Sequence, residues 1–151
     1  KLSPQIVTLP SSYTEFNLAY AHKKCSYCEK YCSDLSLSLC LICGQTLCGD
    51  KCAMADPTEM HLNFHAKKFH RGNCAYISVH SPELILVSDR DLKKTKDLVY
   101  IDGLKQTVQE IFAKYPDTAC LDLKKFNLDE KTAKKIRDMI IYNSFRIHMS
   151  E

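Results

Sequence analysis

The sequence has no tryptophan, only four glycines among 151 residues, and no repeat or low-complexity tract. With 45% hydrophobic and 26% charged residues, this composition excludes a disordered tail and predicts a globular chain with a modest core. No apolar run approaches the ~20 residues that span a bilayer, so no membrane partner is expected. The first residues, KLSPQIVTLP, lack an initiating methionine and a signal-peptide pattern, which indicates an internal or C-terminal fragment of a longer protein.

Cysteine, in contrast, is abundant: the chain has nine, most of them in its first half. A secreted disulfide framework normally has an even number of cysteines and a signal peptide. Closely spaced cysteine pairs that are followed by a histidine are instead typical of a metal site. We therefore expect a zinc-binding protein of a reducing compartment, either the cytoplasm or the nucleus.

Four closely spaced ligand pairs follow one another along the chain. They are Cys25/Cys28, Cys40/Cys43, Cys48/Cys52 and His70/Cys74. Eight ligands suit two tetrahedral zinc ions. In a RING-like cross-brace, the first and third pairs bind one ion and the second and fourth pairs bind the other. In the sequential alternative, the first pair joins the second and the third joins the fourth. In either case we expect Gly44 to adopt a positive φ in the turn after Cys43.

Other cysteines and histidines have less specific spacing. Cys32, His61 and His65 lie among the pairs, and each could replace one of the eight ligands. His61 and His65 are also four residues apart, as residues on one face of a helix are. Cys120 lies in an apolar alternation far from the pairs and is expected to be a buried structural thiol.

The charge of the chain disfavours a nucleic-acid partner. The formal net charge is +3, and seven zinc-bound thiolates with two zinc ions would lower it to zero. The lysine-rich stretches at 91–97 and 123–137 then balance the metal sites. Four protein ligands on each ion leave no position open for a reacting water, so zinc catalysis is not expected.

Outside the cysteine pairs, the sequence predicts an α+β fold with a short antiparallel sheet and two to three flanking helices. Strands are expected at 35–40, leading into the cysteine-rich hairpin, and at 74–80, 83–89, 98–102 and 119–123. We expect one domain, 1–151, in which a strand and helix region at 83–145 packs on a zinc region at 11–80.

Three helices are expected, at 11–24, 103–115 and 127–145. A serine cap with Glu15 starts the first, and an Asn127/Glu130 capping box starts the third. Their apolar faces are Phe16, Leu18 and Ala19 in the first, Leu104, Val108, Ile111 and Phe112 in the second, and Leu128, Ile136, Met139 and Ile140 in the third. The lysines expected outside are Lys93, Lys94 and Lys96 in a loop and Lys131, Lys134 and Lys135 on the third helix.

The order of several motifs resembles the extreme C-terminal domain of UBR-family ubiquitin-protein ligases, the N-recognins. The most specific are LPSSY at 9–13, LCLICG at 39–44 and HRGNC at 70–74; VYIDG at 99–103 and LDLKKFNLDEKTAKKIRDMI at 121–140 follow. The resemblance covers residues 5 to 145. It departs at YIDGLKQ, which lacks the family's glutamate after glycine, and in the absence of tryptophan, so it indicates a diverged member.

This resemblance implies a non-catalytic zinc module of a large RING-type ligase in the ubiquitin and N-degron pathways. In that family the RING and the UBR box lie upstream, and the C-terminal domain caps the helical scaffold and folds back toward the substrate-recognition region. The partners implied are therefore this scaffold, that region or an adaptor protein. The ligands implied by position are Cys40, Cys43, His70 and Cys74, then Cys25 and Cys52, then Cys28 and Cys48.

Two other functions remain open on the sequence. The chain could itself be a RING-like domain that recruits a ubiquitin-conjugating enzyme. Against this alternative, CSYC places Tyr27 between the first ligands, and no cation follows Cys74 in CAYI. A zinc-dependent nucleic-acid binder is the third hypothesis, and the charge argument above disfavours it.

Overall fold

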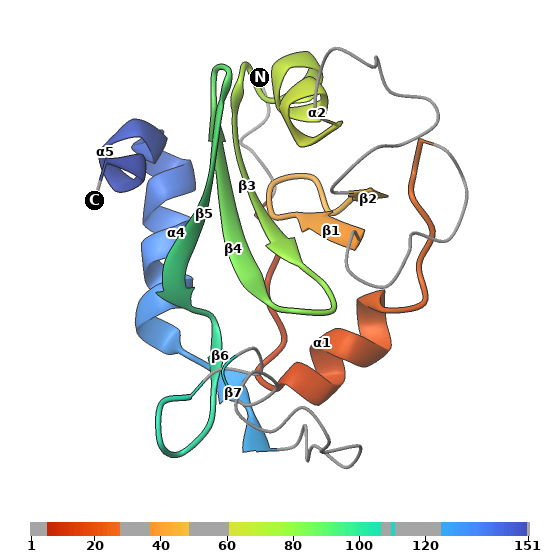
Figure 1. Cartoon of the computed structure of the whole chain (residues 1–151), viewed down its shortest axis with the longest axis vertical. Coiled ribbons are helices and arrows are strands. Elements are labelled where there is room, and N and C mark those ends of the chain that lie inside the picture. Colours follow the sequence, from red (N-terminus) through yellow and green to blue (C-terminus); the bar gives the residue numbers. More distant parts are fainter. Residues whose placement is uncertain (1–5, 28–36, 49–60, 107–109, 111–124, 151) are drawn as a thin grey trace.

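The computed structural model describes residues 6–27, 37–48, 61–106, 110 and 125–150. These residues form an α+β fold with an antiparallel sheet and several helices, as predicted (Figure 1). The elements are α1 (Tyr13–Tyr20), β1 (Leu37–Cys40), β2 (Thr46–Cys48), α2 (His61–Phe69), β3 (Asn73–Ser78), β4 (Glu83–Ser88), β5 (Asp91–Leu98), β6 (Tyr100–Ile101), β7 (Asn127–Leu128), α4 (Glu130–Tyr142) and α5 (Phe145–Met149). Within the described ranges, no helix has the length and apolar character needed to cross a membrane.

The larger sheet has five strands in the order β2-β1-β3-β4-β5, and β6 pairs with β7 in a smaller one. Two hairpins are present: in the predicted cysteine-rich hairpin β1 pairs with β2 around the turn that contains Cys43, and in a second one β3 pairs with β4 around Ser81 and Pro82. β1 also pairs with β3. The cysteine-rich hairpin and the second hairpin are therefore parts of one sheet.

Alternation along the strands separates two faces of this sheet. On one face, Leu39, Ile77 and Leu86 belong to the main core. On the other, Cys40 and Cys74 belong to a second cluster, which lies against α2. Successive strand residues point to opposite faces. The LSLC segment of β1 therefore places its leucines in the main core and its cysteine on the α2 side.

The main core is lined by an aromatic group that explains the LPSSY motif. Tyr13 is buried, and its hydroxyl donates a hydrogen bond of 3.0 Å to the carbonyl of Val79. The hydroxyl of Tyr100 donates to the carbonyl of Pro10 at 2.8 Å, and the two tyrosine rings are 5.6 Å apart. Burial is the main cause that raises the pKa of Tyr13. The motif thus ties the N-terminal segment to the end of β3 and to β6.

Helix α1 begins at the predicted serine cap but is shorter than 11–24. Ser12 Oγ accepts a hydrogen bond from the Glu15 amide at 3.2 Å. Phe16 is fully buried, as predicted, whereas Leu18 is 71% exposed, so its place on the apolar face was wrong. Tyr13 and Phe16 are three residues apart and share the buried face of the helix, while Leu18 falls on the opposite side.

The capping box predicted at Asn127 and Glu130 is also wrong. Asn127 belongs to β7, where it pairs with Ile101, and the cap of α4 is Asp129. The Asp129 carboxylate accepts a hydrogen bond of 2.9 Å from Thr132 Oγ1. The pairing of β7 with β6 keeps Asn127 in extended backbone, so the helix starts three residues later than predicted.

The apolar face predicted for this helix is largely confirmed. Ile136, Met139 and Ile140 are buried, whereas Leu128 is half-buried in β7 and packs against the same core from outside the helix. Asn143 ends α4 in the left-handed region at φ 52°, and α5 follows as a separate helix. The predicted helix 127–145 therefore covers a short strand, the whole of α4 and the first residue of α5.

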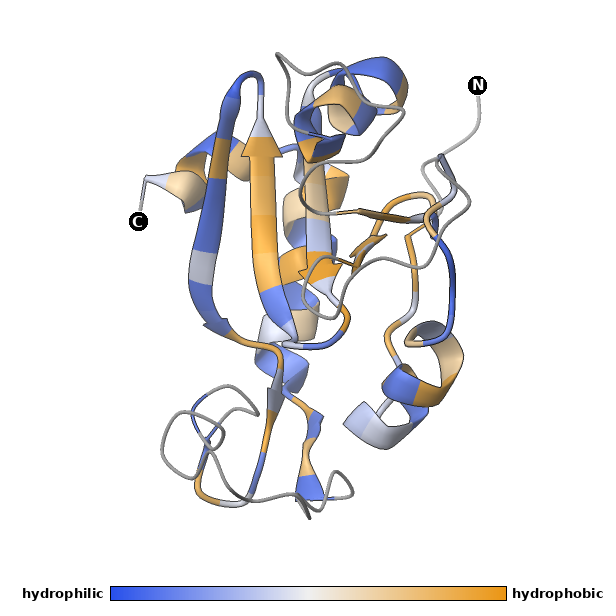
Figure 2. Cartoon of the chain, turned by 45° about the vertical axis from the view of Figure 1, so that its right-hand side comes forward, coloured by the Kyte–Doolittle hydropathy of each residue, from blue (hydrophilic) through white to orange (hydrophobic). Residues whose placement is uncertain are grey.

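The loop predicted around Lys93, Lys94 and Lys96 is a strand, β5, at the edge of the sheet. Figure 2 shows β5 as hydrophilic beside the hydrophobic β4. Lysine on an edge strand discourages pairing with another molecule, so the charges suit this position. Lys94 and Lys96 are exposed, but Lys93 is half-buried and its ammonium donates to the carbonyl of Met149 at 2.8 Å.

The predictions for Lys135, Leu104 and the second helix also differ from the structure or remain untested. Lys135, predicted on the outside, is half-buried and forms an ion pair of 3.0 Å with Asp97 of β5. Leu104, predicted on a core face, is 79% exposed in a turn after β6. Residues 103–106, predicted to start a helix, form a turn instead, so the start of the predicted helix 103–115 is wrong. Residues 107–109 and 111–115 of this helix lie outside the described residues, as do the predicted strand 119–123 and Cys28, Cys32, Cys52 and Cys120.

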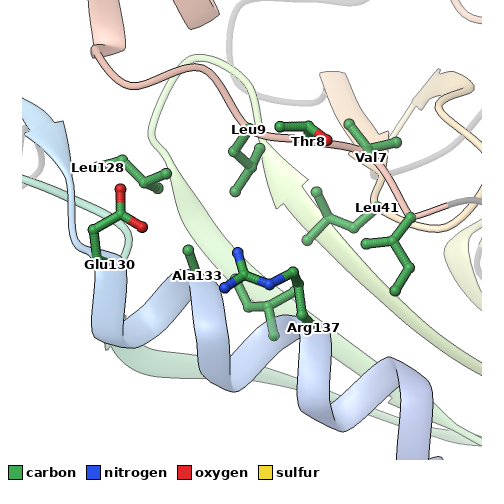
Figure 3. Close-up of a pocket in the computed structure, with 10 residues that line it drawn as sticks. Val7, Thr8, Leu9, Leu41, Leu128, Glu130, Ala133 and Arg137 are labelled. Carbon is green, nitrogen blue, oxygen red and sulfur yellow. The ribbon is translucent and has the colours of Figure 1, made fainter.

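A cavity of about 200 Å³ lies between the segment 6–9 and α4 (Figure 3). Its lining is mostly apolar, with Glu130 and Arg137 as the charged residues. None of the lining residues is a cysteine or a histidine. The predicted metal ligands Cys40 and Cys74 lie instead on the α2 side of the sheet.

Candidate metal centre

Two cysteines of the centre come from the end of β1 and the turn after it. The Gly44 amide donates to the carbonyl of Cys40 at 2.9 Å, and the Cys40 amide donates to the carbonyl of Gln45 at 2.9 Å. Gly44 has a φ of 80°, which confirms the positive φ predicted for it. A residue with a Cβ rarely adopts this conformation. The turn brings the thiols of Cys40 and Cys43 to the same side.

Two histidines come from α2 and from the residue that follows its end. His65 lies in the middle of α2, and the His70 amide donates to the carbonyl of Ala66 at 2.8 Å. The Gly72 amide donates to the same carbonyl at 2.9 Å, with Gly72 at φ 88°. This helix ending turns the chain sharply into β3. His65 and His70 consequently face the same space above the sheet.

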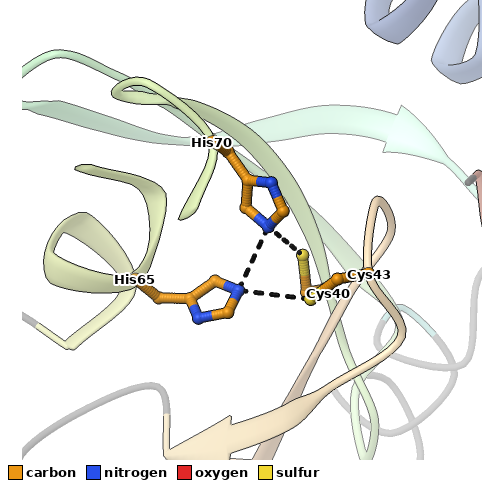
Figure 4. A group of neighbouring side chains, drawn as sticks. All are labelled: Cys40, Cys43, His65 and His70. Atoms are coloured by element: carbon orange, nitrogen blue, oxygen red, sulfur yellow. Dashed lines mark hydrogen bonds between the residues drawn. The ribbon is translucent and has the colours of Figure 1, made fainter. Parts of the chain in front are cut away.

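The four side chains converge, as Figure 4 shows, and their ligand atoms all lie within 4.8 Å of one another. The His65 and His70 Nε2 atoms are 3.2 Å apart. Cys40 Sγ is 3.4 Å from His70 Nε2, and Cys43 Sγ is 3.4 Å from His65 Nε2.

These separations fit the edges of a zinc tetrahedron. Zinc bonds of about 2.0 Å to nitrogen and about 2.3 Å to sulfur give edges of about 3.3 Å between two nitrogens and about 3.5 Å between nitrogen and sulfur. The observed distances are within about 0.1 Å of these values. The Cys₂His₂ cluster could hold one metal ion.

Cys74, predicted as a ligand together with His70, lies at the border of this cluster. Its Sγ atom is 3.4 Å from Cys40 Sγ, and the residue is fully buried on the same face of the sheet. Its thiol also lies 3.7 Å from the carbonyl of Ala75. Cys74 does not belong to the set of four whose ligand atoms are mutually within 4.8 Å.

The thiols of the cluster hold their protons tightly when no metal is bound. The hydrogen bond with Cys43 lowers the pKa of Cys40, but a bond with Cys74 and burial outweigh it and raise this pKa to about 12. The bond with Cys40 and burial raise the pKa of Cys43. A metal ion would have to displace these protons, because the thiolate is the ligand.

Cys25 and Cys48, which only the cross-brace alternative assigns to the same ion, are neighbours. The Cys48 amide donates to Cys25 Sγ at 3.4 Å, and both residues are buried. Their predicted co-ligands, Cys28 and Cys52, lie outside the described residues. In the part of the chain that the structure describes, the Cys₂His₂ cluster is the one group of three or more closely placed ligand atoms.

Tyr27 connects the turn after Cys25 with α2. Its hydroxyl is 2.8 Å from His65 Nδ1, and its ring meets the ring of His61 edge-on at 4.6 Å. Burial, followed by the nearby thiols of Cys43, Cys25 and Cys40, raises the pKa of Tyr27 to about 12. Tyr27 therefore keeps its hydroxyl proton at neutral pH.

Each of His61 and His65 was predicted as a residue that could replace one of the eight ligands, and their surroundings differ. His61 is buried, burial lowers its pKa, and neither of its ring nitrogens has a hydrogen-bond partner among the described residues. His65 lies in the cluster. The spacing of His61 and His65 on one helix does not show which of them is a ligand. The cysteine ligands of the cluster, Cys40 and Cys43, come from a strand and a turn that are distant in the sequence.

The fold and the cluster define a small α+β protein with a candidate metal centre. The chain belongs to the Proteolysis_6 C-terminal family, whose model matches residues 1–103. Membership of this family indicates a role in the N-degron pathway of proteolysis. No curated protein and no solved structure matches the chain significantly.

Proposed function

We propose that the chain is a non-catalytic, zinc-binding C-terminal cap of a large UBR-family ubiquitin ligase, with a role in scaffold closure and in substrate or adaptor binding. The observation that carries this proposal is the convergence of Cys40, Cys43, His65 and His70 at the spacing of a zinc tetrahedron. The family match over residues 1–103 supports the link to the N-degron pathway.

Zinc has a structural role in this proposal. The sequence assigns two ions to Cys25, Cys28, Cys40, Cys43, Cys48, Cys52, His70 and Cys74, and the structure offers His65 as a further donor. A structural zinc site contributes on the order of 10 kcal/mol to folding at neutral pH. The ions would hold the β1 to β2 hairpin, the turn after Cys25 and α2 together, and the five-stranded sheet supports the proposal of a single domain.

The donor set favours a structural ion over a catalytic one. Cys40 and His65 are fully buried, and four protein ligands leave no coordination position for water. A reaction at the metal would need such a position. The function proposed for this module is therefore contact with other parts of the ligase.

The outer side of α4 offers a surface for this contact. Lys131, Lys134, Asp138 and Tyr142 follow one another at three- and four-residue spacing, so they share one stripe of the helix. Tyr142 is 76% exposed and Ile141 beside it is 58% exposed. Exposed apolar residues next to charged ones are typical of protein interfaces.

We propose that this stripe docks on an acidic surface of the parent ligase's helical scaffold. Lys134 already forms an exposed ion pair of 2.6 Å with Asp138, and such a pair contributes little to stability. The lysines would instead set the association rate and its dependence on salt. Truncation of Tyr142 or Ile141 would mainly change the dissociation rate.

The test is charge reversal in the parent ligase. Lys131→Glu with Lys134→Glu should weaken binding of substrate or adaptor, while discharge of ubiquitin from the conjugating enzyme stays normal. Lys94→Glu with Lys96→Glu, on the exposed edge of β5, is the matched control. The proposal fails if deletion of residues 1–151 abolishes discharge in a folded ligase but leaves substrate and adaptor affinities unchanged.

A further inference from the structure

Five side chains with ligand atoms lie at the candidate metal centre, which has four coordination positions. Cys40, Cys43 and His70 belong both to the set predicted from the sequence and to the set that converges in the structure. The fourth position can be taken by Cys74 or by His65. Zinc in a structural site takes four ligands, so one of these two is left over.

The distances favour His65. Its Nε2 atom is 3.2 Å from His70 Nε2 and 3.4 Å from Cys43 Sγ, so it has two contacts of tetrahedral length. Cys74 has one contact with the set, 3.4 Å to Cys40 Sγ, and this is shorter than the edge of about 3.8 Å between two zinc-bound sulfurs. A thiol at that place can instead donate a hydrogen bond to the sulfur of Cys40.

The hydroxyl of Tyr27 determines which nitrogen of His65 is free to bind. It lies 2.8 Å from Nδ1, and a tyrosine hydroxyl can accept as well as donate. When Nδ1 carries the proton and donates it to Tyr27, Nε2 keeps its lone pair and points toward the cluster. Metal-binding histidines almost always donate their other ring N–H in this way.

Tyr27 itself is held in place from two sides. The Ser26 amide and hydroxyl both donate to the carbonyl of Thr46 at 2.8 Å, which fixes the turn against β2. The Tyr27 ring contacts His61 edge-on at 4.6 Å and His65 at 5.9 Å. These contacts hold the Tyr27 hydroxyl in its position next to His65 Nδ1.

We propose that Tyr27 is a positioning residue that selects His65 as the fourth metal ligand, so that the ion is held by Cys40, Cys43, His65 and His70 and Cys74 remains a thiol. This inference rests on the proposed function in requiring that zinc binds at the cluster. Tyr27 lies between Cys25 and Cys28, so it also links the cluster mechanically to the turn proposed for the other ion.

The experiment uses the zinc-loaded chain, labelled with ¹³C and ¹⁵N and kept reduced. Long-range ¹H–¹⁵N spectra show for each histidine which ring nitrogen is protonated and which is bound to metal, and the Cβ shift of each cysteine distinguishes a zinc thiolate from a thiol. We expect Nε2 of His65 and of His70 to be zinc-bound, Nδ1 of His65 to be protonated, and Cys74 to be a thiol.

The decisive variant is Tyr27→Phe, which keeps the ring contacts and removes only the hydroxyl. Chelator competition followed on the His70 ring signals should show a loss of zinc affinity of about 10- to 100-fold at this centre. The Cβ signal of Cys74 should also move toward the zinc-thiolate position, as Cys74 replaces His65 in part of the molecules. Tyr142→Phe makes the same chemical change on the surface and should alter neither signal.

The outcomes separate this inference from the proposed function. A wild-type centre in which Cys74 is a zinc thiolate and His65 is unbound would overturn the inference while zinc binding stands. An unchanged affinity and unchanged ligand signals in Tyr27→Phe would overturn the role of Tyr27. If no signal of the five donors responds to zinc, the proposed function itself fails.

Discussion

The φ of 80° at Gly44 leads to a sharp prediction about the turn that carries Cys43. Alanine at this position would place a Cβ in the left-handed region, which costs roughly 1–2 kcal/mol. The added Cβ would lie 3.6 Å from Val7 Cγ2, an ordinary contact, so no steric term adds to the backbone cost. We expect Gly44→Ala to lower the free energy of unfolding by about 1–2 kcal/mol.

The same strain should weaken metal binding. If the turn is free to relax when the metal is absent, a cost of about 1.4 kcal/mol corresponds to a tenfold loss of zinc affinity. Denaturant unfolding of the zinc-loaded chain gives the stability, and competition with a chelator gives the affinity. Gly44→Asn should have a smaller effect than Gly44→Ala, because asparagine tolerates the left-handed region better.

Gly103 supplies the matched control. A Cβ built at Gly103 meets nothing within 4 Å, and its backbone does not require a positive φ. Gly103→Ala should therefore be neutral or stabilise the chain by up to about 1 kcal/mol. Equal stabilities of Gly44→Ala and Gly103→Ala would refute the argument that the turn at Cys43 depends on the conformation of Gly44.

The core supplies two further predictions, both measured as free energies of unfolding in denaturant. Phe16→Ala should cost about 3–5 kcal/mol, because the ring is fully buried, whereas Leu18→Ala on the exposed side of α1 should stay within about 0.5 kcal/mol; comparable losses would contradict the assignment of the buried face. Tyr13→Phe should cost about 1–2 kcal/mol, because it removes the buried hydrogen bond to the Val79 carbonyl; an unchanged stability would show that this bond is not needed.

Several parts of the fold followed from local patterns in the sequence. The Leu and Ser alternation before Cys40 predicted a strand, and β1 places Leu37 and Leu39 in the main core. The serine cap before Glu15 and the positive φ of Gly44 were also correct. These features depend on neighbours in the chain, which a sequence shows directly.

The errors arose where partners distant in the sequence decide the structure. The lysines of β5 resemble a loop, but pairing with β4 makes this segment a strand, with Lys93 bonded to α5 and Asp97 to α4. Pairing of β7 with β6 displaced the start of α4 from Asn127. Strand preference depends strongly on such context.

The candidate centre shows the same limit. The spacing of Cys40 and Cys43 was informative because this pair is local, whereas the approach of His65 depends on how α2 packs against β2, β3 and β4. Cys74 lies on the face of the sheet that α2 covers and His65 lies in α2, and the sequence alone does not show which of them is the ligand. The three-dimensional positions of their ligand atoms do.

The most direct test of the central claim is the zinc content of the chain with and without Cys43. This cysteine is exposed at the cluster, so Cys43→Ser removes a ligand without opening a cavity in the core. Elemental analysis and native mass spectrometry of reduced protein should find about two zinc ions per wild-type chain and at least one ion fewer in Cys43→Ser. A wild-type chain that folds cooperatively without zinc, or equal zinc contents in the two proteins, would contradict the account.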